Sequence, residues 1–174
     1  LETTYTITYF HNGSENYPFP LDLHSHTFYE INIITQGKGV QFQRERLGVK
    51  RGNVFILPPD ITHGYCDATD DFNIFHLLIS PSFLQRYHAE LNAFPGYKML
   101  FKTLSVIPHA SLKDFAFYLN PKQMTEIEKI IDSLISLNQS KYKGKEVQRN
   151  ALALYLIGRL CEYVYTPIKE SVKT

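Results

Sequence analysis

The run HSHTFYE, at residues 24–30, places two histidines and a glutamate within seven residues and constrains the fold more than any other feature. His24 and His26 are two residues apart, so on a β-strand their side chains point to the same face. Their Cα atoms would lie roughly 6.7 Å apart, which lets two imidazoles reach one point. On a straight strand Glu30 would lie about 13 Å beyond His26. If Glu30 belongs with the histidines, the chain must bend at residues 27–29.

The first half of the chain has the pattern of short β-strands separated by turns. Polar and apolar residues alternate, or apolar residues run together, at 4–10, 29–36, 40–46, 54–57 and 72–79. Glycine- and proline-containing turns follow at 37–39, 50–53 and 58–60. Val40 and Phe42 alternate with Gln41 and Gln43, as expected of the second strand of a hairpin. Short strands at this spacing predict an antiparallel barrel or sandwich.

The second half is predicted to be helical. Ser80 and Pro81 form a helix-start signal for a short helix at about 81–91, and Asn120-Pro121 repeats the signal. After it, apolar side chains recur every three or four residues on one helix face: Met124, Ile127, Ile131, Leu134 and Leu137. A further helix is expected from about Glu146 to Tyr165.

The last helix is apolar on two sides. Its first stripe contains Val147, Ala151, Leu154, Gly158 and Cys161, and its second contains Leu152, Leu156, Leu160 and Tyr163. A helix packed on one core needs a single stripe, so the second predicts a homodimer interface. Complete burial of the helix within one subunit is the alternative.

Composition restricts the class of protein. The 174 residues suffice for one compact core, and 18 basic against 17 acidic residues do not suit a nucleic-acid-binding face. Two widely separated cysteines and the lack of a membrane span or signal pattern favour a reduced, cytoplasmic protein. Because the chain starts at Leu1 rather than Met and ends on a polar tail, we expect a longer natural protein.

A metal site is one hypothesis for the histidine run. His63 follows the turn at 58–60, and with His24, His26 and Glu30 it would complete a nitrogen and oxygen ligand set for a divalent transition metal such as Zn, Ni, Fe or Mn. A single HxH pair is more often structural than metal-binding. The other four histidines, His11, His76, His88 and His109, are expected to be structural or surface residues.

The sequence resembles the cupins in two motifs. His24, His26, Glu30 and Gly37 match the first, and Gly52, Pro58 and His63 match the second. Asp60 replaces a usual glycine and Asp67 a usual asparagine, which puts the geometry of the turn before His63 in question. The resemblance implies a mainly β fold with C-terminal helices: a cupin barrel (a double-stranded β-helix or jelly roll) followed by an antiparallel helix pair.

The runs HxHxFYEI, VKRGNVFILPPDITHGY and SPSFL resemble, more narrowly, the N-terminal sensing domain of AraC-type transcription regulators. This resemblance implies an N-terminal arm at 1–20, a barrel at 21–110 including the helix at 81–91, and a helical dimerisation region at 120–165. It also implies a DNA-binding helix-turn-helix domain beyond residue 174.

The expected function is therefore effector sensing and dimerisation rather than catalysis. The effector would be a small molecule, such as a sugar, and DNA would be bound only through the domain beyond residue 174. The residues expected to bind the effector are His24, His26, Glu30, Asn32, His63 and Tyr65. A metal-dependent cupin enzyme, either a dioxygenase or a sugar isomerase, is the alternative, because a metal with open positions can activate water, O₂ or a carbonyl.

Overall fold

The computed structural model describes the backbone of residues 5–11, 20–101 and 109–171, and the side chains of 20–101 and 109–165. The chain divides into two compact units. The first comprises Leu1–Phe83 and Phe101–Tyr118, and the second comprises Leu84–Leu100 and Leu119–Thr174.

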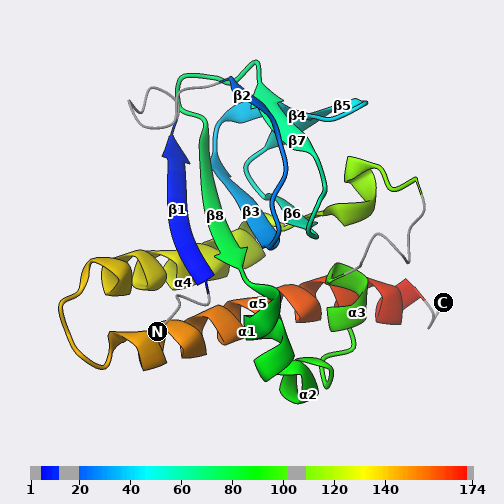
Figure 1. Ribbon diagram of the computed structural model, residues 1–174. Coiled ribbons are helices and arrows are strands. Elements are labelled where there is room, and N and C mark those ends of the chain that lie inside the picture. The colour runs from blue at the N-terminus through cyan, green and yellow to red at the C-terminus, as the bar shows by residue number, and fades with distance from the viewer. Residues whose placement is uncertain (1–4, 12–19, 102–108, 172–174) are drawn as a thin grey trace. The chain divides into compact units, whose positions relative to one another are not determined.

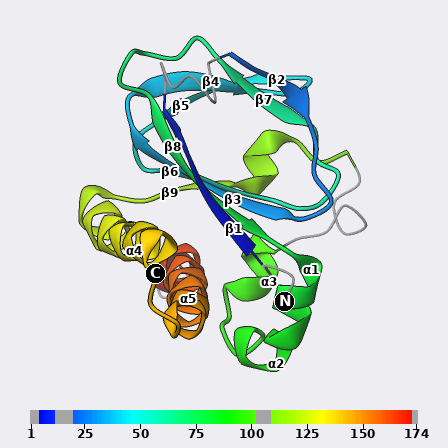
Figure 2. The same cartoon turned by 60° about the vertical axis from the view of Figure 1, so that its left-hand side comes forward.

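The first unit is a β-barrel of two antiparallel sheets that face each other (Figures 1 and 2). One sheet has the order β1-β8-β3-β6-β9, formed by Tyr5–His11, Asn73–Ile79, Tyr29–Gln36, Asn53–Leu57 and Ala116–Tyr118. The other has the order β2-β7-β4-β5, formed by Leu21–His24, His63–Cys66, Lys38–Phe42 and Arg46–Lys50. A short 3-10 helix, Leu112–Phe115, precedes β9. The predicted β-rich fold with C-terminal helices is confirmed.

The barrel core forms where strands of both sheets present apolar side chains to one another. Ile34, Phe55, Tyr65, Phe72 and Ile74 are each 0% exposed and belong to one cluster. On β4 the burial differs from the expected alternation, because Gln41 is fully buried whereas Val40 and Phe42 are partly exposed. The reason is that Gly39, on the same face as Gln41, lies against the ring of Phe72 in this core.

The predicted bend after the histidine pair is present. β2 ends at His24, whose strand partner is His63 in the smaller sheet. β3 begins at Tyr29 in the larger sheet, where Glu30 pairs with Leu57 and Leu78. The chain therefore changes sheets between residues 24 and 29, and His26 lies on the connection rather than on a strand.

The N-terminal segment is a strand of the larger sheet. β1 pairs with β8 in continuous antiparallel register, from Tyr5 opposite Ile79 to His11 opposite Asn73. The expected arm at 1–20 is therefore hydrogen-bonded to the barrel over residues 5–11. Residues 1–4 and 12–19 of the expected arm lie outside the described residues.

The second unit is helical, and its principal elements are α4 (Pro121–Gln139) and α5 (Lys145–Ser171). Asn120 caps α4 by accepting from Gln123 N at 2.9 Å, as the sequence predicted. The two helices run antiparallel and side by side (Figure 1). Arg159 joins them by donating to Glu126 Oε2 at 2.7 Å. No helix among the described residues is long and apolar enough to cross a membrane.

Residues 84–100 differ from the expected domain boundaries. The helix expected at 81–91 is two short helices, α1 (Pro81–Arg86) and α2 (His88–Leu91), and α3 (Tyr97–Leu100) follows. From Leu84 onward this segment belongs to the helical unit, not to the barrel. Close packing on α5 explains the difference, because a Cβ at Gly96 would lie 2.1 Å from the carbonyl oxygen of Cys161.

The predicted dimer stripe is divided between different environments. Leu156 and Leu160 are 0% exposed within the single chain, so neither is available to a partner subunit. Leu152 is partly exposed, and Tyr163 is partly exposed and hydrogen-bonds to Glu126 of α4. Because Leu156 and Leu160 are buried within the chain, the interface predicted at this stripe is corrected. Among the described side chains of α5, the large apolar ones that are exposed lie on another face, at Val147 (74%) and Tyr155 (57%).

Gly37→Ala should destabilise the barrel by about 2 kcal/mol or more. Gly37 has φ +73°, and a Cβ there would lie 2.7 Å from Phe72 Cα. Gly48→Ala is the matched control on β5, because nothing lies within 4 Å of its Cβ position. Urea unfolding monitored by circular dichroism should show a loss for Gly37→Ala only. Equal midpoints for the two variants would contradict the strained turn.

Candidate functional site: a buried histidine and carboxylate cluster

Three histidines from two chain segments meet at one end of the barrel interior. His24 lies at the end of β2, His26 follows on the connection to β3, and His63 begins β7. The ring centroids of His24 and His26 are 4.9 Å apart, and those of His24 and His63 are 4.6 Å apart. The three imidazoles predicted from the sequence are thus together, with His63 almost fully buried.

Glu30 lies against these imidazoles on the opposite sheet. Its Oε2 is 3.0 Å from Nε2 of His63 and 3.3 Å from Nε2 of His26. The carboxylate is 3% exposed, so it is a buried charge surrounded by imidazole rings. The bend between β2 and β3 is what turns Glu30 inward to this position.

A fourth histidine, His76, binds the other oxygen of Glu30. His76 lies on β8, and its Nδ1 is 2.5 Å from Glu30 Oε1. Burial favours a raised pKa for Glu30, but the contacts with His26, His63 and His76 outweigh it and hold that pKa well below its usual value. Burial lowers the pKa of His76, and the attraction of Glu30 offsets this only in part. We therefore assign an ionised Glu30 that accepts a hydrogen bond from a neutral His76.

Backbone carbonyls orient two of the imidazoles. Nδ1 of His24 is 2.7 Å from the carbonyl oxygen of Asp22, and Nδ1 of His63 is 3.1 Å from that of Ile61. In the neutral rings Nδ1–H donates to these carbonyls, which leaves Nε2 with a lone pair. His63 Nε2 then faces Glu30 Oε2, and neither atom makes a well-aligned hydrogen bond among the described residues. The contact requires a shared proton or a cation between them.

The aspartate that replaces the usual glycine preserves the turn before His63. Asp60 has φ +67°, in the left-handed region that aspartate tolerates better than most residues. Its backbone N–H donates to the carbonyl oxygen of His26 at 2.8 Å. This bond ties the second motif directly to the first. The replacement therefore leaves His63 beside His24 and His26.

The cluster has the donors that a divalent transition metal requires. One ligand nitrogen from each of His24, His26 and His63 lies within 4.8 Å of the others. Nitrogens bound to one ion at about 2.1 Å with tetrahedral angles are about 3.4 Å apart, so the most widely separated rings would have to move closer by about 1 Å or more. The carbonyl-oriented tautomers suit metal binding, because bound histidines commonly donate their other N–H to a carbonyl. Glu30, the fourth predicted ligand, is outside this three-histidine group and lies beside it.

Asn32 and Tyr65, the other residues predicted to bind a ligand, extend the polar region across the barrel. Both are 0% exposed, and Asn32 Nδ2 donates to Tyr65 Oη at 3.1 Å. Burial, followed by the charge of Glu30, raises the pKa of Tyr65 well above its usual value, so the phenol keeps its proton. The Tyr65 ring lies 6.4 Å from His63 and 6.5 Å from His76, measured between centroids. All six predicted ligand-binding residues therefore line one region.

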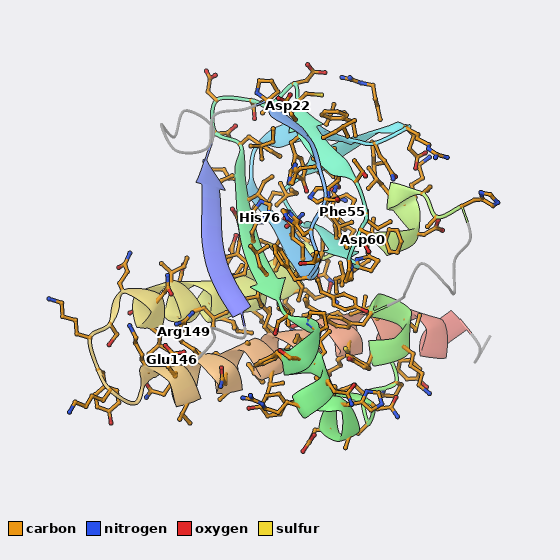
Figure 3. The ribbon with its side chains drawn as sticks, viewed as in Figure 1. Asp22, Phe55, Asp60, His76, Glu146 and Arg149 are labelled. Atoms are coloured by element: carbon orange, nitrogen blue, oxygen red, sulfur yellow. The ribbon has the colours of Figure 1, made fainter. Side chains whose placement is uncertain are left out.

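His76 is the member of the cluster that the sequence did not predict. Figure 3 shows it in the barrel together with Phe55. The available signal was a polar residue within the apolar strand 72–79, but its partner became evident only from the pairing of β8 with β3, where His76 lies opposite Asn32. His88 and His109 are exposed, in agreement with their expected surface roles. The side chain of His11 lies outside the described residues.

Comparison with known proteins gives three findings. The family model of the AraC-like ligand binding domain matches residues 4–157. The HTH-type transcriptional activator RhaR of Mannheimia succiniciproducens is 24% identical over 147 residues, which are 84% of this chain and 48% of that protein. The crystal structure of apo ToxT K231A from Vibrio cholerae has a TM-score of 0.59 at 10% identity, over 95% of this chain and 57% of that one. The chain thus spans about half the length of the proteins it matches.

Proposed function

The chain belongs to the family of AraC-like ligand-binding domains, and we propose that it senses a small hydroxylated effector, such as a sugar, inside its barrel. The observation that carries the proposal is the buried polar set around Glu30, His63 and His76. Burying polar and charged groups is costly unless they have partners, so a fold retains such a set where it has a use. Polar groups converging in an enclosed site are typical of small-molecule recognition.

The regulatory output is proposed to come from a DNA-binding segment outside these 174 residues. The relative RhaR is an HTH-type activator, and this chain covers only 48% of it. The near balance of 18 basic and 17 acidic residues gives this chain little attraction for DNA of its own. An effector would act by binding one arrangement of the whole protein better than another, which shifts their populations. Such a regulator works in the cytoplasm, beside its DNA.

Thermal unfolding with a panel of aldopentoses, aldohexoses, their alditols and small carboxylic acids tests effector binding. A ligand that binds only the folded state stabilises it by RT ln(1 + [L]/Kd), about 2.7 kcal/mol at 100 times Kd. For a chain of this size we expect at least one neutral hydroxylated compound to raise Tm by about 5–10 °C. A panel in which only carboxylic acids, or no compounds, raise Tm would contradict the proposed effector class.

We also propose that His24, His26 and His63 hold a divalent transition metal, with Glu30 beside it to balance the charge. The support is the lone-pair contact of His63 Nε2 with Glu30 Oε2 at 3.0 Å, which a cation would relieve. A bound metal would supply a positive site that polarises an effector oxygen. The protein residues orient and shield that site.

Metal content measured by inductively coupled plasma mass spectrometry, on protein purified without a histidine tag, tests this site. We expect close to one ion per chain in the wild type and a loss of affinity of about 100-fold or more in His63→Ala. His88→Ala is the control, because His88 is exposed on α2. Full metal occupancy of His63→Ala would exclude the three-histidine site.

A metal-dependent enzyme remains the second candidate, and the three-histidine group is the observation in its favour. Against it, the family that the chain matches is one of ligand-binding domains. We therefore propose a sensor that is not an enzyme. Turnover of the stabilising compound by metal-loaded protein, followed by mass spectrometry, would overturn this proposal.

Homodimerisation is proposed through the exposed face of α5 that contains Val147, Ala151 and Tyr155. These residues are four apart, so they form one stripe, and Tyr155 borders a hollow of about 220 Å³ lined also by Phe94 and Gly158. Light scattering should give twice the 20.2 kDa chain mass. Tyr155→Glu should give the monomer, whereas Tyr142→Glu, at an exposed site before α5, should not. A monomeric wild type would contradict the interface.

A further inference from the structure

Gln41, on β4, is a buried amide that makes no hydrogen bond with any described residue. It is 0% exposed, and neither Oε1 nor Nε2 has a partner among the described residues. An amide removed from water without replacement hydrogen bonds destabilises a fold. A leucine or methionine would fill the same volume without that penalty. The Gln41 amide therefore lowers the stability of the folded protein at this position.

The side chain of Gln41 points into the barrel. Gly39, two residues earlier on the strand, would direct a Cβ toward the Phe72 ring at 3.1 Å, and residues two apart share a face. Gln41 is also directly opposite Tyr65 in the antiparallel pairing of β4 with β7. Side chains opposite each other in a sheet lie on one face and in contact range. Gln41 therefore lies beside the Tyr65 ring on the core side.

Polar side chains on neighbouring strands lead from Gln41 toward the histidine cluster. Tyr65 accepts from Asn32 Nδ2, and Asn32 lies opposite His76 in the pairing of β3 with β8. His76 in turn contacts Glu30. Asn32 Oδ1, like the amide of Gln41, has no hydrogen-bonding partner among the described residues. Gln41 and Asn32 thus offer unused donors and acceptors in this part of the barrel.

We propose that Gln41 is a specificity-determining residue that binds hydroxyl groups of the effector, together with Asn32. A hydroxyl suits this end because it can accept from Gln41 Nε2 and donate to an amide oxygen. A second hydroxyl can donate to Asn32 Oδ1. None of the buried charged residues in the described part of the barrel is Lys or Arg, so this end favours an uncharged group over a carboxylate or phosphate. The inference rests on the proposed effector site and assigns its neutral end.

Thermal unfolding of Gln41→Met without any ligand is the first test. Methionine has a similar length and no amide, so the variant should be more stable than the wild type, with Tm higher by about 2–4 °C. This sign is opposite to that of most buried substitutions. A lower Tm, or failure to fold, would show that the amide is already hydrogen-bonded in the free protein and would overturn the assignment.

The same sugar and alditol panel, applied to both proteins, is the second test. A compound that raises the wild-type Tm should lose most of its effect on Gln41→Met. Thr35→Val is the matched control on β3, because Thr35 Oγ1 donates to the carbonyl oxygen of Asn73 at 3.2 Å. That variant should lower the Tm of the free protein and keep the shift caused by the compound.

The outcomes separate this inference from the proposed function. A compound that shifts the wild type and Gln41→Met equally would overturn the role of Gln41 and leave the effector site standing. A panel that shifts neither protein would overturn the hydroxylated effector and the assignment of Gln41 with it. A compound that loses its effect on both Gln41→Met and Thr35→Val would show general loosening of the barrel and also overturn the assignment.

Discussion

The buried carboxylate of Glu30 is the interaction on which the arrangement of the barrel interior depends. An ionised carboxylate that is 3% exposed is tolerated only with close polar partners, and removal of one partner from a buried pair typically costs about 3–5 kcal/mol. The partners come from both sheets, since His63 lies on β7 and His76 on β8. Satisfying one charge therefore fixes strands of the two sheets relative to each other.

Local backbone features make this convergence achievable. The change of sheet between His24 and Tyr29 turns Glu30 inward, and the bond from Asp60 N to the carbonyl oxygen of His26 brings the turn before β7 to the same place. Carbonyls of Asp22 and Ile61 then fix the tautomers of His24 and His63. Each constraint acts over a few residues, so the site is assembled largely by short-range structure on a rigid β framework.

The predictable part of the fold was the part governed by local pattern. The bend followed from the spacing of His26 and Glu30, and the start of α4 from Asn120 and Pro121. The contribution of His76 depended on which strands are neighbours, a long-range property that strand periodicity does not encode. The face of Gln41 was not evident for a similar reason, since its burial follows from Gly39 packing on Phe72, 33 residues further along the chain. The sequence showed two apolar stripes on α5. Which of their residues lie in the core and which at the surface became clear only from the packing of the helical unit.

The two ends of the polar row differ in how they balance stability against recognition. At the histidine end, the Glu30 carboxylate already lies against His26, His63 and His76, so a ligand or cation there must rearrange contacts that already exist. At the other end, neither the Gln41 amide nor Asn32 Oδ1 has a hydrogen-bonding partner among the described residues, so a bound hydroxyl would add hydrogen bonds without breaking any. Binding energy is therefore gained most directly at the Gln41 end. Any coupling between an effector and the rest of the protein would pass through Asn32 and His76 to Glu30, the group that joins the two sheets.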